Sequence, residues 1–284
     1  MYFAPGSLSE AISLYDAHPQ ATLLGGGTDV LVNVAHGKST LEAIIDLKRV
    51  CGLDFISEDG KNVKIGSTAT ISDVGESLLI HERYPFLQKA ALKLGSWQIR
   101  NMATVGGNLC NAAPSAELAT PLLAANATAV IVGPNGERKM ALSDFFRGPG
   151  KTSLGQDEIM KKIILPPLGN GVSGIYMRHQ LRRSMDISIV NMTVLLQLNN
   201  NIVSDASIYL GAVAPIPMKA TETEKKIIGH QLDDQIIEAA SETAAAEAKP
   251  ITDIRASANY RRQMVKVYMK RALMALRDRG VSPR

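Results

Sequence analysis

The sequence predicts an α+β protein organised in three blocks. Helices and short strands alternate in the first block, the pattern changes near Leu53, and a linker rich in proline and glycine at 166–171 precedes three strands and two helices. With 284 residues, of which 45% are apolar and 20% charged, the chain has ordinary globular composition. A chain of this length can bury a sizeable core.

The first block begins with a predicted helix over residues 8–16. Ser7 precedes it and Glu10 follows three residues later, which is the spacing of a capping box. Residues 21–24 form an apolar run that predicts a strand. Apolar residues at helical spacing then predict a helix over 29–36, and residues 43–47 predict a second buried strand.

The second and third blocks are separated by the linker. Before it we expect a strand at 62–66, a helix opening at Ser72, a helix at 84–94, and short strands at 129–132 and 158–165. Beyond it, three antiparallel strands are predicted at 174–178, 187–198 and 206–213. Helices are predicted at 236–248 and 259–277.

Two glycine loops are the features that point most directly to function. The first is Gly25-Gly26-Gly27-Thr28-Asp29 and the second is Thr104-Val105-Gly106-Gly107-Asn108. Glycine inside or beside buried segments costs stability, so it needs a reason. Two such loops flanked by Thr, Asn or Asp indicate backbone N–H groups left free to hold an anion. A dinucleotide pyrophosphate is the natural candidate.

Two other phosphate motifs match only in part. The first loop nearly satisfies the Rossmann pattern, but the third glycine is replaced by Val30, and that interpretation leaves the second loop unexplained. The segment 148–152 resembles the end of a P-loop. However, Phe145 stands where the motif needs glycine, and Pro149 removes an N–H from the phosphate cradle.

Charge and cysteine content exclude several classes of protein. The net charge of +4 is mild for this length, and basic runs with interleaved aromatics are missing, which argues against nucleic-acid binding. Cys51 and Cys110 have no C-x-x-C spacing, so no iron–sulfur cluster or structural zinc of the chain's own is expected. The N-terminus lacks a signal-peptide pattern, and the longest uncharged stretch, 118–132, is too short to span a bilayer. We therefore expect a cytoplasmic protein with no membrane contact.

Several segments together resemble the FAD-binding subunit of the molybdenum hydroxylases, most strongly that of bacterial xanthine dehydrogenases. They are residues 23–30 (LLGGGTDV), 99–111 (IRNMATVGGNLCN), 114–117 (PSAE), 146–152 (FRGPGKT) and 182–188 (RRSMDIS). The resemblance to carbon monoxide dehydrogenase medium subunits and nicotinate dehydrogenase FAD subunits is weaker. The resemblance to the FAD-binding subunit covers nearly the whole chain.

The resemblance implies a fold of the vanillyl-alcohol-oxidase (PCMH) type. Two α/β subdomains, at 1–52 and 53–168, would clamp the flavin. A C-terminal α+β domain at 174–284 would contain a three-stranded antiparallel sheet with helices.

The resemblance also implies a set of FAD contacts in which both glycine loops close over the pyrophosphate. Glycine at 26, 27, 106 and 107 would let the backbone approach the phosphates. Glu117, where the family often has Asp, would accept hydrogen bonds from the ribityl or ribose hydroxyls. Arg178 would lie near the isoalloxazine or ribityl chain, and Lys161 on a strand that passes the ring. The loop contacts would be Thr22, Leu23, Leu24, Gly25, Gly26, Gly27, Thr28, Asp29, Ala103, Thr104, Val105, Gly106, Gly107 and Asn108.

The function implied is electron transfer inside a heterotrimeric oxidoreductase of purine catabolism. Electrons would pass from iron–sulfur clusters on one partner, fed by a molybdenum–pterin partner, to FAD and then to NAD+. A nicotinate, carbon monoxide or aldehyde dehydrogenase type of complex is the alternative. A self-contained nicotinamide-dependent oxidoreductase and a non-catalytic scaffold with an empty site are the rival classes.

Other conspicuous residues have simpler interpretations. Arg182 and Arg183 can be interpreted equally well as charges on the surface or at a subunit interface and as residues of the cofactor site. Cys110 is expected to be a small buried residue without an activating base, and Trp97 a core or subunit-contact residue. The sequence shows no nucleophile–base pair or metal-ligand spacing, so no catalytic side chain and no metal ligand is assigned, and the flavin would carry the chemistry.

Overall fold

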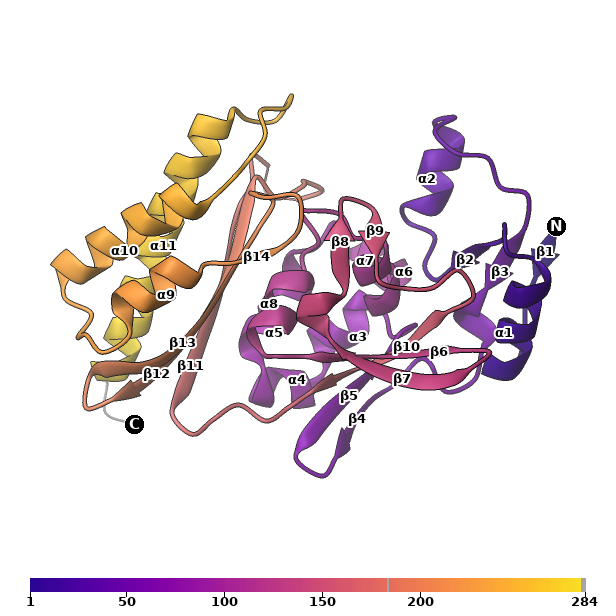
Figure 1. Ribbon diagram of the computed structural model, residues 1–284, viewed down its shortest axis with the longest axis horizontal. Coiled ribbons are helices and arrows are strands. Elements are labelled where there is room, and N and C mark those ends of the chain that lie inside the picture. The colour runs from indigo at the N-terminus through magenta and orange to yellow at the C-terminus, as the bar shows by residue number, and fades with distance from the viewer. Residues whose placement is uncertain (183, 282–284) are drawn as a thin grey trace.

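The computed structural model describes residues 1–182 and 184–281 and contains three main sheets, with helices between and beside them (Figure 1). The N-terminal sheet has the order β1-β3-β2 and is parallel, with β1 at Tyr2–Phe3, β2 at Thr22–Leu24 and β3 at Ile44–Asp46. Parallel neighbours need crossover connections, and α1 (Leu8–Ala17) and α2 (Val30–Ala35) occupy them. A short 3₁₀ helix, Leu47–Arg49, follows β3.

The start of α1 confirms the predicted cap and refines it. The Ser7 hydroxyl accepts a hydrogen bond from the Glu10 N–H at 3.2 Å. The Glu10 carboxylate accepts from the Gly6 N–H at 2.8 Å, one residue before the position that a capping box uses. The predicted strands at 21–24 and 43–47 and the helix at 29–36 are also confirmed, with slightly shorter bounds.

The middle sheet has five antiparallel strands in the order β4-β5-β10-β6-β7. Its central strand, β10 (Ile159–Leu165), comes last in the sequence. The other strands are β4 (Ile56–Asp59), β5 (Asn62–Gly66), β6 (Thr128–Gly133) and β7 (Gly136–Ala141). A small hairpin of β8 (Phe146–Gly148) and β9 (Lys151–Thr152), preceded by the 3₁₀ helix Leu142–Asp144, contains the P-loop-like segment.

Helices pack on one face of this sheet because alternate strand residues on that face are apolar. Val63, Ile131 and Ile163 are fully buried and belong to one core with Ile71, Phe86 and other helical side chains. The helices are α3 (Ile71–Glu76), α4 (Leu78–Arg83), α5 (Pro85–Lys93), α6 (Trp97–Met102), α7 (Val105–Cys110) and α8 (Ala119–Ala124). The sequence indicated α3 and α5 only, because the other four are six-residue helices without a repeating apolar pattern.

The C-terminal sheet is antiparallel with the order β11-β12-β13-β14. The three predicted strands are present as β11 (Val172–His179), β12 (Val190–Asn199) and β13 (Ile202–Gly211). A fourth strand, β14 (Met218–Lys219), was missed, so the expected three-stranded sheet is wrong by one strand. Two residues are too few for an alternating pattern.

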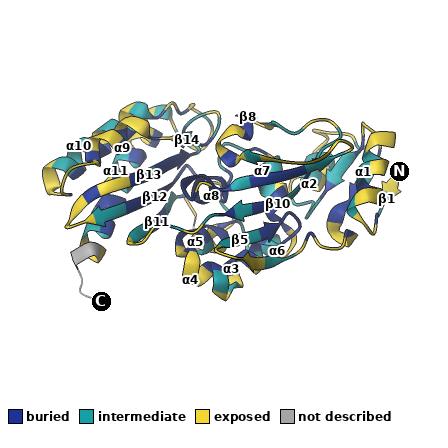
Figure 2. Cartoon of the chain, turned by 60° about the horizontal axis from the view of Figure 1, so that its bottom comes forward, coloured by how far each residue is buried: buried dark blue, intermediate teal, exposed yellow. Residues whose placement is uncertain are grey.

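Both faces of the C-terminal sheet are covered. Tyr176, Leu195 and Tyr209 belong to the core shared with the middle block. Their neighbours Ile175, Val194 and Ile208 belong to a separate core under α10 (Asp234–Glu247) and α11 (Ala258–Val281). This explains why residues 190–196 of β12 are all buried, and Figure 2 shows the burial along β12 and β13. The helix α9 (Thr221–Ile227) precedes α10, and no helix among residues 1–182 and 184–281 is long and apolar enough to cross a membrane.

Candidate functional site

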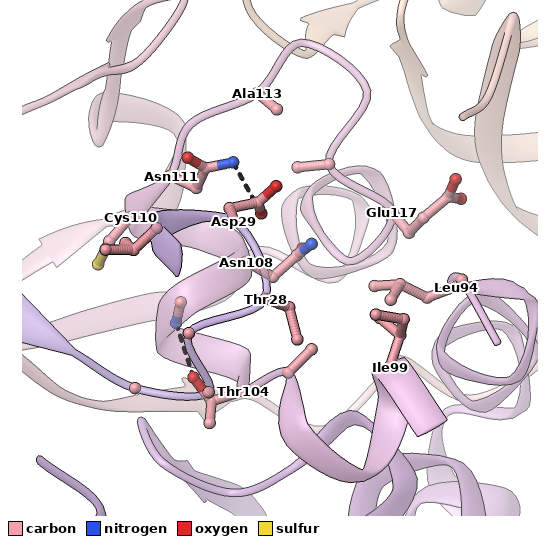
Figure 3. Close-up of a pocket in the computed structure, with 18 of the residues that line it drawn as sticks. Thr28, Asp29, Leu94, Ile99, Thr104, Asn108, Cys110, Asn111, Ala113 and Glu117 are labelled. Carbon is pink, nitrogen blue, oxygen red and sulfur yellow. Dashed lines mark hydrogen bonds between the residues drawn. The ribbon is translucent and has the colours of Figure 1, made fainter. Parts of the chain in front are cut away.

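A cavity of about 540 Å³ lies where all three blocks of the chain meet. Its walls come from the first glycine loop, from α6 and α7, from the segment that leads to α8, and from the stretch before β12 (Figure 3). This volume falls within the range of about 300–1,000 Å³ that is usual for small-molecule and cofactor sites. The lining residues include Leu23, Gly25, Gly26, Gly27, Thr28, Asp29, Leu94, Gly95, Ile99, Ala103, Thr104, Gly107, Asn108, Cys110, Asn111, Ser115, Glu117, Met185, Asp186 and Ile187.

The first glycine loop offers backbone donors to this cavity. It connects β2 to α2, and Gly27 has a φ of +74°, which favours glycine. Within the described part of the chain, the N–H groups of residues 25–29 donate to no protein acceptor. Consecutive free N–H groups that end at a helix start form a binding site for an anion. The sequence-based prediction for this loop therefore has a direct structural basis.

The second glycine loop differs from the expectation of free N–H groups. Residues 105–110 form α7, and Thr104 is its N-cap, with its hydroxyl accepting from Gly107 N–H at 3.0 Å. Gly106 N–H donates to Ser67 O at 2.8 Å, and Asn108 N–H donates to Thr104 O at 2.9 Å. The N–H groups of residues 105–108 are thus already used by the protein.

Two side chains of the second segment can still donate into the cavity. The Thr104 hydroxyl accepts from Gly107, which leaves its own proton available. The Asn108 side-chain oxygen accepts from Leu118 N–H at 3.3 Å, which leaves its NH₂ group for a ligand. Figure 3 shows Asn108, Thr28 and Thr104 around the same space, with Leu94 and Ile99 at its apolar side.

The glycines pack the two loops against each other. A Cβ on Gly26 would lie 1.7 Å from the Met102 carbonyl oxygen, and one on Gly25 would lie 2.6 Å from the Thr104 hydroxyl. A Cβ on Gly106 would lie 2.8 Å from the Ser67 carbonyl oxygen. Glycine at 25, 26 and 106 is therefore required by backbone packing, before any ligand is considered. Motif reasoning had attributed Gly26 and Gly106 to phosphate approach alone.

Glu117 is a buried polar residue of the cavity wall and is 6% exposed. Its carboxylate accepts hydrogen bonds from the hydroxyls of Tyr176 and Ser188 and pairs with Arg178 at 3.2 Å. Burial raises the pKa of Glu117 above its ordinary value, while Arg178 and the two hydroxyls oppose that rise. Burial, together with the nearby Glu117, also raises the pKa of Tyr176, which therefore remains a proton donor.

The neighbouring polar residues are held in different ways. Asn111 donates from its amide to the Asp29 carboxylate at 3.2 Å, which ties the first loop to the end of α7. Cys110 also lines the cavity, and burial raises the pKa of its thiol to about 12. That thiol therefore stays protonated at neutral pH, as expected for a residue without an activating base.

Most of the residues expected at the site are brought together, but six do not line the cavity. Four of them are Thr22 and Leu24 on β2 and Val105 and Gly106 in α7. Arg178 lies behind Glu117, with a side chain 4% exposed. Lys161 is on β10 and pairs with Glu137 at 2.7 Å, so it contributes no side chain to the cavity wall.

Sequence reasoning missed the apolar part of the wall. Leu94, Ile99 and Ile187 line the cavity, and nothing in their local pattern distinguishes them from core residues. Ile99 lies in the segment 99–111 and Ile187 in the segment 182–188, and both segments carried part of the resemblance, which was the available signal. Trp97 is 65% exposed, so the interpretation as a core residue is wrong. Arg183 lies outside the described residues.

The residues present fit FAD. The free N–H groups of the first loop, the Thr104 hydroxyl and the Asn108 amide suit a diphosphate. Leu94, Ile99 and Ile187 supply apolar surface on which a flat ring system can pack.

Two family models together match most of the chain. Residues 1–168 match the family model described as "FAD binding domain in molybdopterin dehydrogenase". Residues 176–276 match the one described as "CO dehydrogenase flavoprotein C-terminal domain".

Individual relatives cover almost the whole chain. The xanthine dehydrogenase FAD-binding subunit of Escherichia coli O157:H7 is 34% identical over 96% of this chain and 94% of its own length. The carbon monoxide dehydrogenase medium chain of Hydrogenophaga pseudoflava is 30% identical, with 96% of each chain covered. A solved carbon monoxide dehydrogenase from the latter organism superposes with a TM-score of 0.94 over 98% of this chain and 97% of its own. The chain therefore belongs to the family of FAD-binding subunits of the molybdenum hydroxylases, and it is an oxidoreductase component.

Proposed function

We propose that this chain is the electron-transfer flavin subunit of a xanthine dehydrogenase complex with NAD+ as the acceptor. The observation that carries the proposal is the cavity with five consecutive free N–H groups at residues 25–29, within a chain similar to xanthine dehydrogenase FAD-binding subunits. A bound flavin supplies the chemistry that connects one-electron carriers to a two-electron acceptor.

The proposed partners are an iron–sulfur subunit and a molybdenum–pterin subunit in a heterotrimer of the cytoplasm. The names of the relatives support this, because they are called subunits or medium chains, and one solved relative is described as lacking the Mo-pyranopterin moiety of the molybdenum cofactor. The chain has two cysteines, too few to hold an iron–sulfur cluster with four thiolates. The clusters would therefore belong to a partner.

Each part of the cavity has a proposed role toward FAD. The first loop, with Thr28 and Asp29 at its end, would hold the diphosphate through its N–H groups, assisted by Thr104 and Asn108. Leu94, Ile99 and Ile187 would exclude water from the ring. Glu117, paired with Arg178 behind it, would supply a polar group to the cavity wall.

The proposed division into domains is 1–52, 53–168 and 174–284. A core of residues such as Ala11, Ala43 and Ile45 supports the first unit, and Leu53 and Ile159 of the middle unit pack into it. A second core supports the middle unit, and the core under α10 and α11 supports the third.

The test is purification of the chain with and without its two partner subunits. We expect one FAD per chain, released and identified by mass, and no iron–sulfur absorbance from this chain alone. The complete complex should then reduce NAD+ with xanthine. A flavin-loaded complex that left xanthine unoxidised would refute the substrate assignment. A chain that never takes up FAD would refute the cofactor role.

A second candidate is a related hydroxylase with a different substrate. The similarity to carbon monoxide dehydrogenase and nicotinate dehydrogenase subunits, at 30% and 27% identity, favours it. Turnover of carbon monoxide, nicotinate or an aldehyde in place of xanthine would identify it. Turnover of a small substrate by the isolated chain would instead support a self-contained oxidoreductase.

A further inference from the structure

The loop between α10 and α11, residues 248–257, exposes two large apolar side chains. Ile251 is 70% exposed and Ile254 is 99% exposed. The Tyr260 ring, in the first turn of α11, adds a third apolar surface and is 40% exposed. Single exposed apolar residues are ordinary on a protein surface, but three of them in one segment of ten residues indicate a surface that another molecule covers.

Hydrogen bonds hold this loop in one shape. The Asp253 carboxylate accepts from the N–H groups of Arg255 at 2.9 Å and Ala256 at 3.1 Å. The Asp253 N–H in turn donates to the Ala256 carbonyl oxygen at 3.1 Å. These bonds close a turn around Ile254, so its side chain is held in a defined position although almost all of it lies in water.

The loop is also fastened to the C-terminal sheet. Arg261 is 3% exposed, and its guanidinium donates to the carbonyl oxygens of Ile189 at 2.7 Å and Ala212 at 3.1 Å. At the other end of the loop, the Lys249 N–H donates to the Val213 carbonyl oxygen at 2.8 Å. A loop fixed in this way loses little conformational freedom when a partner covers it, which favours binding.

Positive charge surrounds the exposed isoleucines. Residues 248–262 contain four cations and one carboxylate. That carboxylate, Asp253, already pairs with Arg261 at 2.9 Å. Lys249 and Arg262 are exposed, so the surface keeps an excess of positive charge. A molecule that covers this loop is therefore favoured when it presents carboxylates beside its apolar contact.

We propose that this loop is a docking surface that places Ile254 in an apolar socket on a partner subunit of the complex, with carboxylates of the partner at the rim of the socket. The inference rests on the proposed function, because that function supplies the partner subunits. It goes beyond that function by assigning a surface through which this chain joins them. An apolar side chain that is exposed before binding and covered after it can anchor a protein–protein interface.

Two other occupants fit this surface less well. In a symmetric dimer the loop would face its own copy, and the cations at Lys249 and Arg262 would lie opposite the same cations. A membrane would receive only two isoleucines, which is a small apolar area for stable attachment. A protein with a complementary socket satisfies both the apolar and the charged parts of the surface.

The primary variant is Ile254→Ser, and Leu78→Ser is its matched control. Leu78 is 76% exposed and lies at the start of α4, at the lower edge of Figure 1, whereas the loop between α10 and α11 is at the upper edge. The measurement is the affinity of each full-length chain for the purified complex of the iron–sulfur and molybdenum–pterin subunits. We expect Ile254→Ser to weaken binding about thirtyfold, the scale of an interface anchor, and Leu78→Ser to bind as the wild type does. Both variants should keep the wild-type FAD content and unfolding midpoint, because neither exposed side chain supports the fold.

Charge reversal supplies a second readout that loss of apolar area would not produce. Lys249→Glu keeps the main-chain bond to Val213 but places a carboxylate opposite the acidic rim. We expect its association rate to fall about tenfold at low salt, and the difference from wild type to shrink as salt is added. Lys61→Glu makes the same change of net charge in the turn between β4 and β5 and should affect the rate much less. Equal effects of the two reversals would overturn the acidic rim.

The remaining outcomes count against the proposal. If Ile254→Ser binds as tightly as the wild type, or loses no more affinity than Leu78→Ser, the loop is not the docking surface. A concentration-dependent dimer that Ile254→Ser abolishes would identify a second copy as the occupant. Sedimentation with vesicles of phosphatidylcholine and phosphatidylserine, lost in the same variant, would identify a membrane. A wild-type chain that never binds the partner complex would refute the proposed function, whereas a wild-type chain that binds and an Ile254→Ser chain that binds equally well would refute this inference alone.

Discussion

At the scale of single residues, the glycines of the first loop are fixed by contacts that only the folded chain reveals. The sequence shows that Gly25, Gly26 and Gly27 adjoin a predicted buried strand, where glycine lowers stability and its presence requires an explanation. It does not show that the Met102 carbonyl, 76 positions away in the chain, occupies the space of a Cβ at Gly26. Local patterns predicted the loop, but a long-range contact explains it.

The first prediction concerns Gly26→Ala. The added methyl group would lie 1.7 Å from the Met102 carbonyl oxygen, so the two loops must move apart. We expect a loss of stability of about 1–3 kcal/mol and a large loss of FAD affinity. Denaturant unfolding and flavin titration measure the two effects. Gly6→Ala is the control, because its methyl group would meet only Glu10 at an ordinary 3.9 Å.

The second prediction concerns the pH dependence of Arg178→Met. Burial raises the pKa of Glu117, and Arg178 is the largest opposing influence, so the variant should raise this pKa further. A carboxyl whose folded pKa lies above its unfolded pKa stabilises the fold least at high pH, because the unfolded chain releases the proton first. Arg178→Met should therefore lose more stability, relative to wild type, at pH 8 than at pH 5.

Unfolding midpoints at the two pH values test this. Arg178→Lys keeps a cation and should show a smaller difference between pH 8 and pH 5. An equal loss of stability at both pH values would mean that Arg178 does not affect the pKa of the Glu117 carboxyl.

At the scale of elements, the long segments of the C-terminal block were predicted well, whereas the short helices α4, α6, α7 and α8 were not. The strands and helices of the C-terminal block have enough residues to show a period of 2 or 3.6. Residues 104–108 were interpreted as a loop because they contain two glycines, which are poor helix formers, yet residues 105–110 form α7. Two contacts stabilise the start of this helix: the local cap by the Thr104 hydroxyl and the long-range hydrogen bond from Gly106 N–H to Ser67 O. Neither contact can be inferred from the composition of the segment.

The third prediction addresses this cap. Thr104→Val removes the hydroxyl that accepts from Gly107 N–H while keeping the shape of the side chain. We expect a loss of about 1–2 kcal/mol in stability, as for other N-caps, and weaker FAD binding. Thermal unfolding and flavin titration measure these. Thr104→Ser, which keeps the cap, should lie close to wild type, and a Thr104→Val protein with unchanged stability would show that the cap is dispensable.

At the scale of the whole molecule, the resemblance and the linker predicted the order of the blocks but not how they share a core. Tyr176, Leu195 and Tyr209 of the C-terminal sheet are buried among side chains of the middle block. Sequence patterns show which face of a helix or strand is apolar. They do not show which other element packs against that face. The cavity depends on this shared core, because its wall includes residues from both sides of the linker.

The fourth prediction is that the middle and C-terminal blocks unfold together. Gly174 lies at their contact, where a Cβ would be 2.6 Å from the Phe86 ring and 2.5 Å from Leu195. We expect one calorimetric transition for the wild type and a broadened or split transition for Gly174→Ala. Gly169→Ala, whose methyl group would be 3.5 Å from Val172, is the control and should keep the single transition. Two transitions in the wild type would contradict the shared core.

The position of β10 in the middle sheet has a consequence for synthesis on the ribosome. β10 separates β5 from β6, so neither strand has its inner neighbour until residues 159–165 have been made. A nascent chain of about 150 residues therefore carries two unpaired strand edges, which can pair with other chains. Translation pauses before residue 159 would prolong this exposed state. A chain released at that length would aggregate, whereas extension through residue 165 supplies the strand that closes the sheet.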